Sequence, residues 1–223
     1  MKNSNDSTQI TIEEIDKILK RKRFSLFLIR CFDIFASFFG IIFFLPVFAI
    51  TSLVIRAKDG KPIIFKQERV GKNGKIFKIF KYRTMKVEQE VGRLKITTED
   101  DDRITKLGRK LRKSKIDELP QLFNVLRGEM SFVGPRPESK KYVDLYNDLQ
   151  RSILKVRPGI TGLASLKYYD QGEILGESED PEYTYITKIM PDKIELNIEY
   201  IKKMGFFYNI GLILKTIFHR RKK

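Results

Sequence analysis

The sequence predicts a mostly helical α+β fold in which a re-entrant membrane helix precedes one domain with a small β-hairpin and interfacial amphipathic helices. Three features predict it: an apolar segment at residues 34–55, two β-rich runs on either side of residues 71–74, and apolar residues at helical spacing through much of the remainder. A chain of 223 residues can hold one domain of ordinary size and a tethering element. We therefore divide it into a polar tail with a short amphipathic helix (1–23), the re-entrant helix (24–56) and the main domain (57–223).

The first 23 residues predict a tail followed by a surface helix. Residues 1–9 are polar, which is typical of disorder, whereas Ile12, Ile15, Ile18 and Leu19 recur at helical spacing. Such an amphipathic helix is suited to lie on a membrane surface.

The apolar segment is long enough to cross a bilayer. It contains 22 consecutive uncharged residues, which as a straight helix would extend about 33 Å. Pro46 lies within it, and we predict a break there because proline removes a backbone donor and clashes with the preceding turn. Both flanks are basic, so the positive-inside rule places both ends in the cytoplasm. A helix that enters, bends at Pro46 and returns fits these features, and a simple spanning helix is the alternative.

Residues 62–85, PIIFKQERVGKNGKIFKIFKYRTM, predict the hairpin, with its turn at 71–74. A stripe of lysines follows it: Lys72, Lys75, Lys78 and Lys81. The stripe is either a solvated edge or a surface that contacts lipid headgroups. Beyond the hairpin, residues 88–102 are acidic and rich in turn formers, which predicts a mobile loop.

The adjacent carboxylates Asp117 and Glu118 follow a strongly cationic run. Helical spacing over 103–127 is interrupted near Pro120, so we expect one helix to end near Lys115 and another to begin at 118 or 119. The pair then lies at a helix start, where negative charge or a bound phosphate is favoured. We expect the neighbouring cations to lower the pKa of both carboxyl groups, which suits a nucleophile or a metal ligand. A surface salt-bridge cluster is the alternative.

Three arginines are candidates to bind phosphate beside this pair. Arg112 lies in the cationic run, and Arg136 and Arg157 lie in the Gly/Pro-rich loops SFVGPRPE and KVRPGITG. Their forked guanidinium groups match phosphate geometry, and Mg²⁺ could share the task. Structural turns with solvated charges are the alternative reading of both loops.

Composition excludes several kinds of chemistry. Cys31 is the sole cysteine, so the chain has no internal disulfide and no multi-cysteine zinc site, and His219 is the sole histidine, in a basic tail. Catalysis by a Ser-His-Asp triad or a histidine metal cluster is therefore not expected. Forty-four Lys+Arg against 28 Asp+Glu give a net charge of +16, which favours anionic partners.

From about Arg30 to His219 the sequence resembles the bacterial sugar transferase family, the monotopic polyprenyl-phosphate phosphoglycosyl transferases, in their minimal single-domain form. The resemblance rests on Arg30 and Asp33 at the entry to the apolar segment, and on the blocks FKIFKYRTM, DDRITKLGRKLRKSKIDELPQLFNVLRGEMSFVGPRPE and KVRPGITGLAS. The chain departs from the family pattern at Leu45, Lys115, residues 163–165 and Tyr169.

The resemblance implies a membrane helix broken at Pro46 and a catalytic domain on the cytoplasmic face of the bacterial inner membrane. It also implies that Asp117 attacks the β-phosphate of a UDP-sugar, expels UMP and carries the phosphosugar until undecaprenyl phosphate takes it. Glu118 is the partner carboxylate, Asp117 and Mg²⁺ form the implied metal site, and Arg112, Arg136 and Arg157 are the implied substrate-binding residues.

Two other functions remain open from the sequence. One is a catalytically silent, membrane-tethered scaffold of the same fold, which the departure at Tyr169 motivates. The other is a membrane-anchored nucleic-acid binder, which the charge motivates but for which the sequence contains no recognisable motif, so we expect no nucleic-acid partner. The expected partners are a UDP-sugar, undecaprenyl phosphate and inner-membrane lipid, and the sequence leaves a homodimer open.

Overall fold

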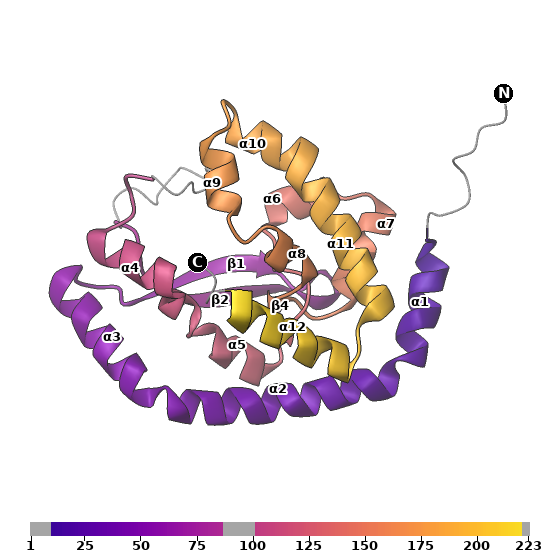
Figure 1. Ribbon diagram of the computed structural model, residues 1–223, viewed down its shortest axis with the longest axis horizontal. Coiled ribbons are helices and arrows are strands. Elements are labelled where there is room, and N and C mark those ends of the chain that lie inside the picture. Colours follow the sequence, from indigo (N-terminus) through magenta and orange to yellow (C-terminus); the bar gives the residue numbers. More distant parts are fainter. Residues whose placement is uncertain (1–9, 87–100, 220–223) are drawn as a thin grey trace.

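A computed structural model describes residues 10–86 and 101–219 (Figure 1). The polar tail expected over 1–9 and most of the acidic loop expected over 88–102 lie outside the described residues. The described part is mostly helical with a small antiparallel sheet, as the sequence predicts. Its N-terminal half consists of α1 (Ile12–Arg21), α2 (Arg23–Phe43), α3 (Leu45–Lys58), β1 (Ile64–Val70), the 3₁₀ turn η1 (Lys72–Gly74), β2 (Ile76–Tyr82) and α4 (Lys106–Ser114).

The remaining elements are shorter until the last two helices. They are η3 (Ile116–Glu118), α5 (Gln121–Arg127), β3 (Ser131–Val133), α6 (Lys140–Val143), α7 (Asp148–Arg151), η4 (Ser152–Lys155), β4 (Gly159–Thr161), α8 (Leu163–Lys167), α9 (Gln171–Gly176), α10 (Pro181–Thr184), the π turn η5 (Tyr185–Ile189), α11 (Met190–Lys203) and α12 (Phe206–His219).

The predicted hairpin is present: β1 and β2 pair antiparallel from Ile64 opposite Tyr82 to Val70 opposite Ile76. In Figure 1 it lies in the middle of the molecule, with α5 on one side and α6 on the other. Asn124 of α5 is fully buried and covers one edge of β2, because its side chain accepts from the Phe80 amide and donates to the Lys78 carbonyl. A second pair, β3 with β4, is parallel.

The apolar segment forms two helices that meet at Phe44. Pro46 lies in the first turn of α3, where a proline is tolerated, and the break falls two residues before it. In Figure 1, α2 runs along one edge of the molecule beneath α5 and α12, and α1 and α3 turn up from its two ends. Among the described residues, α2 is the helix that is long and apolar enough to cross a membrane by length and composition.

One face of α2 packs on the main domain. Ile29, Asp33 and Ser37 are buried at helical spacing, and a Cβ atom on Gly40 would lie 3.5 Å from Leu122 of α5. The opposite face exposes a row of large apolar side chains, among them Phe24, Phe27, Phe35, Phe38, Phe39, Ile42 and Phe43. One face of the helix therefore packs on protein, and the other exposes an apolar surface large enough to be an interaction site, for example with lipid.

Arg30 and Asp33 attach α2 to two elements of the main domain. Arg30 donates to the carbonyls of Val125 and Leu126 in the last turn of α5, at 2.7 and 2.9 Å, and the Val125 carbonyl also accepts from the Gly128 amide. Asp33 Oδ1 accepts from the Ser131 hydroxyl and the Phe132 amide, both at 3.1 Å. These contacts hold α5 and β3 in place. Along the chain, these two elements connect the acidic pair to Arg136.

Both ends of the α2–α3 segment join the same packed body. At one end, the Lys22 ammonium donates to the carbonyls of Lys202 and Met204 at the end of α11. At the other end, the guanidinium of buried Arg83, just after β2, donates to the carbonyls of Asp59, Gly60 and Lys61.

The two C-terminal helices differ from each other. The sequence of 194–200 and 206–218 is compatible with interfacial helices and equally with core packing, and α11 is a core helix: it packs against α1 and α8 and buries Ile194, Tyr200 and Ile201. α12 buries Leu212 and leaves Phe207 86% exposed, together with Leu214, Ile217 and Phe218. Of the two, α12 is therefore the one with an amphipathic outer face.

Candidate active site

Asp117 and Glu118 lie in a short turn between two helices. α4 ends at Ser114, Lys115 adopts the left-handed conformation (φ 56°), and the 3₁₀ turn η3 carries the acidic pair before α5 begins at Gln121. The helix boundaries expected near Lys115 and Glu118 are confirmed to within a few residues. Because the pair lies outside any regular helix, the two neighbouring side chains have different surroundings.

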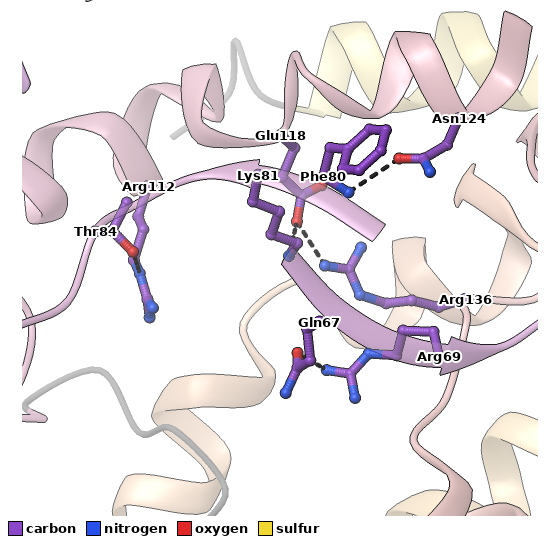
Figure 2. Close-up of polar contacts among 9 residues, drawn as sticks. All are labelled: Gln67, Arg69, Phe80, Lys81, Thr84, Arg112, Glu118, Asn124 and Arg136. Carbon is purple, nitrogen blue, oxygen red and sulfur yellow. Dashed lines mark hydrogen bonds and ion pairs between the residues drawn. The ribbon is translucent and has the colours of Figure 1, made fainter. Parts of the chain in front are cut away.

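Glu118 is held by two cations. One of its oxygens, Oε1, accepts from Lys81 Nζ at 2.9 Å and from Arg136 Nη2 at 2.6 Å (Figure 2). Lys81 comes from β2, and Arg136 comes from the loop after β3. One carboxylate thus joins the hairpin to the SFVGPRPE loop.

Asp117 is buried without such a partner. The residue is 7% exposed, and among the described residues its Oδ1 atom has no hydrogen-bond partner. An unpaired buried carboxylate oxygen costs folding free energy, and a bound ion or a catalytic role would explain it; within the described part of the chain Oδ2 of Asp33 is also buried and unpaired, but Asp33 does not line the cavity described below.

The environment shifts the two pKa values in opposite directions. Burial, and then the charge of Glu118, raise the pKa of Asp117 above its ordinary value. Burial would also raise the pKa of Glu118, but Arg136 and Lys81 more than offset it and hold that pKa well below the usual range. The expectation that nearby cations lower both values is therefore wrong for Asp117, because its desolvation outweighs the attraction of Lys81, Arg112 and Lys115.

The pair opens into a cavity of about 490 Å³, within the size range of small-molecule sites. Among the described residues that line it are three carboxylates, Asp117, Glu118 and Glu138, and eight cationic side chains, namely Arg69, Lys81, Arg103, Arg112, Lys115, Arg136, Lys141 and Lys193. This excess of positive charge suits an anionic ligand.

The structure brings two of the three predicted arginines to the cavity. Arg136 binds Glu118, and Arg112 lines the wall with its Nε atom donating to the Thr84 hydroxyl at 2.9 Å (Figure 2). Arg157 is not among the lining residues; its Nε atom donates to the Gly128 carbonyl at 2.9 Å. We expected all three arginines at the site, but only Arg112 and Arg136 line the cavity, and Arg157 does not.

The two Gly/Pro-rich loops pack backbone against backbone, which explains their glycines. A Cβ atom on Gly159 would lie 2.1 Å from the Gly134 amide nitrogen, and one on Gly162 would lie 2.3 Å from the Gly134 carbonyl. The KVRPGITG loop therefore supports the loop that carries Arg136, so its role at the site is indirect.

Sequence reasoning missed several lining residues. Lys81 belongs to the lysine stripe of the hairpin, but it is partly buried on Glu118, whereas Lys72, Lys75 and Lys78 are exposed. Arg69 lies on β1, where its guanidinium donates to Gln67 (Figure 2). A cation in an amphipathic strand gives no local signal that it faces a cavity.

Two positions where the chain departs from the family pattern touch each other. The Lys115 ammonium lies 5.0 Å from the centre of the Tyr169 ring, which is a cation–π contact. Lys115 also lines the cavity, so this contact joins the α4–η3 turn to the segment before α9 at the edge of the site.

The chain belongs to the bacterial sugar transferase family, whose model matches residues 24–223. Two curated relatives are longer than this chain. The galactosyl transferase CpsE of Streptococcus agalactiae serotype III (strain NEM316) is 39% identical over 171 residues, which are 72% of this chain and 35% of that protein. The UDP-N-acetylgalactosamine-undecaprenyl-phosphate N-acetylgalactosaminephosphotransferase of Aeromonas hydrophila is 36% identical over 196 residues, 86% of this chain and 43% of that protein.

A third relative is similar in length. The sugar transferase EpsL of Bacillus subtilis (strain 168) is 38% identical over 189 residues, which are 84% of each chain. This chain thus matches less than half of the first two relatives and most of the third.

Proposed function

We propose that this protein transfers a phosphosugar from a UDP-sugar to undecaprenyl phosphate and releases UMP, as the first membrane step of surface glycan synthesis. The family and the printed name of the Aeromonas relative support this reaction. The observation that carries the proposal is the buried, unpaired Oδ1 atom of Asp117 in a cavity with excess positive charge.

The reaction has two displacements at one phosphorus atom. A carboxylate oxygen of Asp117 attacks the β-phosphorus of the UDP-sugar, the bond from that phosphorus to the bridging oxygen breaks, and UMP leaves with the electron pair. An oxygen of the lipid phosphate then attacks the same phosphorus, and the Asp117 carboxylate is released. Both steps bring like charges together, so cations must screen the phosphates.

The cations around the pair are arranged for this screening. Glu118 binds Lys81 and Arg136, and this holds their charges at the cavity wall beside Asp117. Arg112 is oriented by Thr84 on another part of the wall. We assign Glu118 the role of positioning these cations and assisting the lipid phosphate.

Mg²⁺ fits the residues present, with the substrate as a co-ligand. Among the described residues no group of three or more His, Cys, Asp or Glu side chains could hold a metal ion, whereas the unpaired Oδ1 of Asp117 is an oxygen donor of the kind Mg²⁺ prefers. Asp117 would hold the ion together with phosphate oxygens of the donor. When bound, Mg²⁺ neutralises part of the diphosphate charge.

We further propose that α2 and α3 enter one leaflet of the cytoplasmic membrane and return, with the catalytic domain on the cytoplasmic face. The contacts at both ends support this: Lys22 at one end and the Asp59–Lys61 carbonyls at the other bind the same packed body. A spanning segment would place its two ends about 30 Å apart on opposite sides of the hydrocarbon core. The lipid acceptor would then meet the nucleotide donor at the membrane surface.

Replacing the nucleophile tests the proposal. Asp117→Asn should reduce UMP release from a UDP-sugar and undecaprenyl phosphate by about 10³-fold or more, because the amide cannot form the acyl phosphate. The wild-type protein should retain labelled phosphosugar after incubation with the donor alone. EDTA should stop both this labelling and the release of UMP. Asp144→Asn, at an exposed carboxylate on the surface, is the matched control.

The outcome also separates enzyme from scaffold. Because the fold raises the pKa of Asp117, its ionised form lowers stability at pH 7, and the Asn variant should melt no lower than the wild type. A scaffold would release no UMP with any member of a panel of UDP-sugars. Undiminished turnover in a folded Asp117→Asn variant would refute Asp117 as the nucleophile.

A further inference from the structure

Lys193 is a buried cation on the wall of the same cavity that the mechanism above does not use. It lies in the first turn of α11, is 9% exposed, and its Nζ atom is 5.2 Å from the centre of the Tyr185 ring. Tyr185 belongs to the π turn η5 directly before α11, and such turns recur at functional sites. α11 therefore contributes Lys193 to the cavity wall, although the acidic pair lies on a different element.

The ammonium group of Lys193 has few partners. It donates one hydrogen bond, to Oε1 of Gln171 at 2.9 Å, and within the described parts of the chain no carboxylate forms an ion pair with it. Glu138 is the carboxylate whose charge acts on it, but Glu138 is engaged elsewhere: one oxygen accepts from the Ser139 amide and the other from the Tyr185 hydroxyl. An ammonium has three donors, so this one has hydrogen-bonding capacity left in the cavity.

A buried ammonium without a carboxylate partner is costly unless a ligand completes it. Burial lowers the pKa of Lys193 to about 8, with Glu138 opposing the shift and Arg136 adding to it. The group is thus mostly protonated at neutral pH and loses its charge at a mildly alkaline pH. If no anion bound at this position, a hydrophobic or neutral polar residue would fill it at a lower cost in folding free energy.

We propose that Lys193 binds a phosphate oxygen of a substrate in this cavity, with Gln171 orienting its ammonium group. The inference rests on the proposed function, because it assigns an anionic contact within the same site. The phosphate belongs either to the donor diphosphate or to the acceptor lipid. In the first case Lys193 affects the KM for the UDP-sugar, and in the second it affects the KM for undecaprenyl phosphate.

The first test separates the two substrates. With the full-length protein in lipid nanodiscs, Lys193→Gln should raise the KM for one substrate, UDP-sugar or undecaprenyl phosphate, about tenfold or more, as expected when a charged hydrogen bond is lost. The kcat value should change much less. Lys188→Gln, at an exposed lysine of the preceding turn, is the matched control and should leave both KM values unchanged. Equal KM values in wild type and a folded Lys193→Gln variant would overturn the proposal.

The second test uses pH and the conservative variant. In the wild type the affected KM should rise as the pH passes about 8, and Lys193→Arg, which stays protonated, should remove that rise. Tyr142, Tyr185 and Arg136 do not account for such a rise, because the pKa of Tyr142 is raised to about 12 and those of Tyr185 and Arg136 are also raised. A rise in KM near pH 8 that persists in both the Gln and the Arg variant, as in the wild type, would show that Lys193 has only a structural role.

A binding measurement keeps the inference independent of turnover. Titration of UDP and of undecaprenyl phosphate into wild type, Lys193→Gln and Lys193→Arg should show weaker binding of one ligand in the Gln variant and recovery in the Arg variant. This result can hold even if no UDP-sugar supports turnover, so failure of the proposed reaction and failure of this inference are distinguishable. Unchanged binding of both ligands in a Gln variant with the wild-type melting temperature would overturn the inference.

Discussion

Asp117 and Glu118 are sequence neighbours to which the fold gives different environments. Two cations bind Glu118 and keep it ionised, whereas Asp117 is desolvated and its Oδ1 is unpaired. Burial is the main cause of the raised pKa of Asp117, and the negative charge of Glu118 raises it further. Glu118 therefore influences both the positions of the two cations and the protonation of Asp117.

This coupling predicts a shift in pH dependence. Glu118→Gln removes a negative charge beside Asp117 and frees Lys81 and Arg136 from their ion pairs, so the pKa of Asp117 should fall. The acid limb of UMP release against pH should move to lower pH, while the maximal rate drops about tenfold or more because the cations lose their positioning. Glu173→Gln, at an exposed carboxylate on α9, is the control. An acid limb that stays in place or moves to higher pH would contradict the coupling.

At the residue scale, the sequence predicted the candidates better than their environments. The helix break before Pro120 correctly located Asp117 and Glu118 between two helices. The direction of the Asp117 shift could not be predicted, because cations nearby in sequence lower a carboxyl pKa whereas burial, which depends on the tertiary fold, raises it. Lys193 was missed for a related reason: it is distant in sequence and becomes part of the cavity only when α11 packs.

The elements around the site are fixed by hydrogen bonds to main-chain groups of neighbouring segments. Asn124 covers an edge of β2, and Arg30 binds the last carbonyls of α5. The family resemblance drew attention to Arg30 and Asp33, and the structure supplies their physical reason. Periodicity in the sequence predicts helices and strands, but it does not predict which side chain closes the end of another element.

Arg30 therefore should stabilise the site from α2. Arg30→Met removes both donors to α5 and leaves the Val125 and Leu126 carbonyls without these partners, which should cost about 2–3 kcal/mol of unfolding free energy. The melting temperature in nanodiscs should fall, and activity should fall with it because α5 follows the acidic pair. Arg23→Met, at an exposed arginine on the same helix, should leave the melting temperature unchanged. Equal stability of the two variants would remove this role from Arg30.

At the scale of the whole molecule, the apolar segment is part of the packed body. Ile15 of α1 and Ile29 of α2 lie in the same hydrophobic cluster as Met190 and Tyr200, and Ile55 of α3 packs with Tyr82. The sequence predicted an apolar segment with a break and basic flanks, and left a spanning helix as the alternative. The tertiary contacts at both of its ends are the support for the re-entrant form that we propose.

Cysteine labelling tests this topology. In a Cys31→Ser background, Lys17→Cys on α1 and Lys110→Cys on α4 place single thiols at exposed positions before and after the apolar segment. A membrane-impermeant maleimide should label both variants in inside-out vesicles and neither in right-side-out vesicles. Labelling of the two positions from opposite sides would establish a spanning helix.

The protein-facing side of α2 means that the apolar helices cannot be trimmed away to yield a water-soluble domain. A fragment starting after Lys58 would lack Arg30 and Asp33, and it would uncover Leu122 where Gly40 now lies against it. Such a truncation would expose to water the apolar surfaces that Ile15, Ile29 and Ile55 now cover and should aggregate, so extraction must keep an amphiphile around the intact chain.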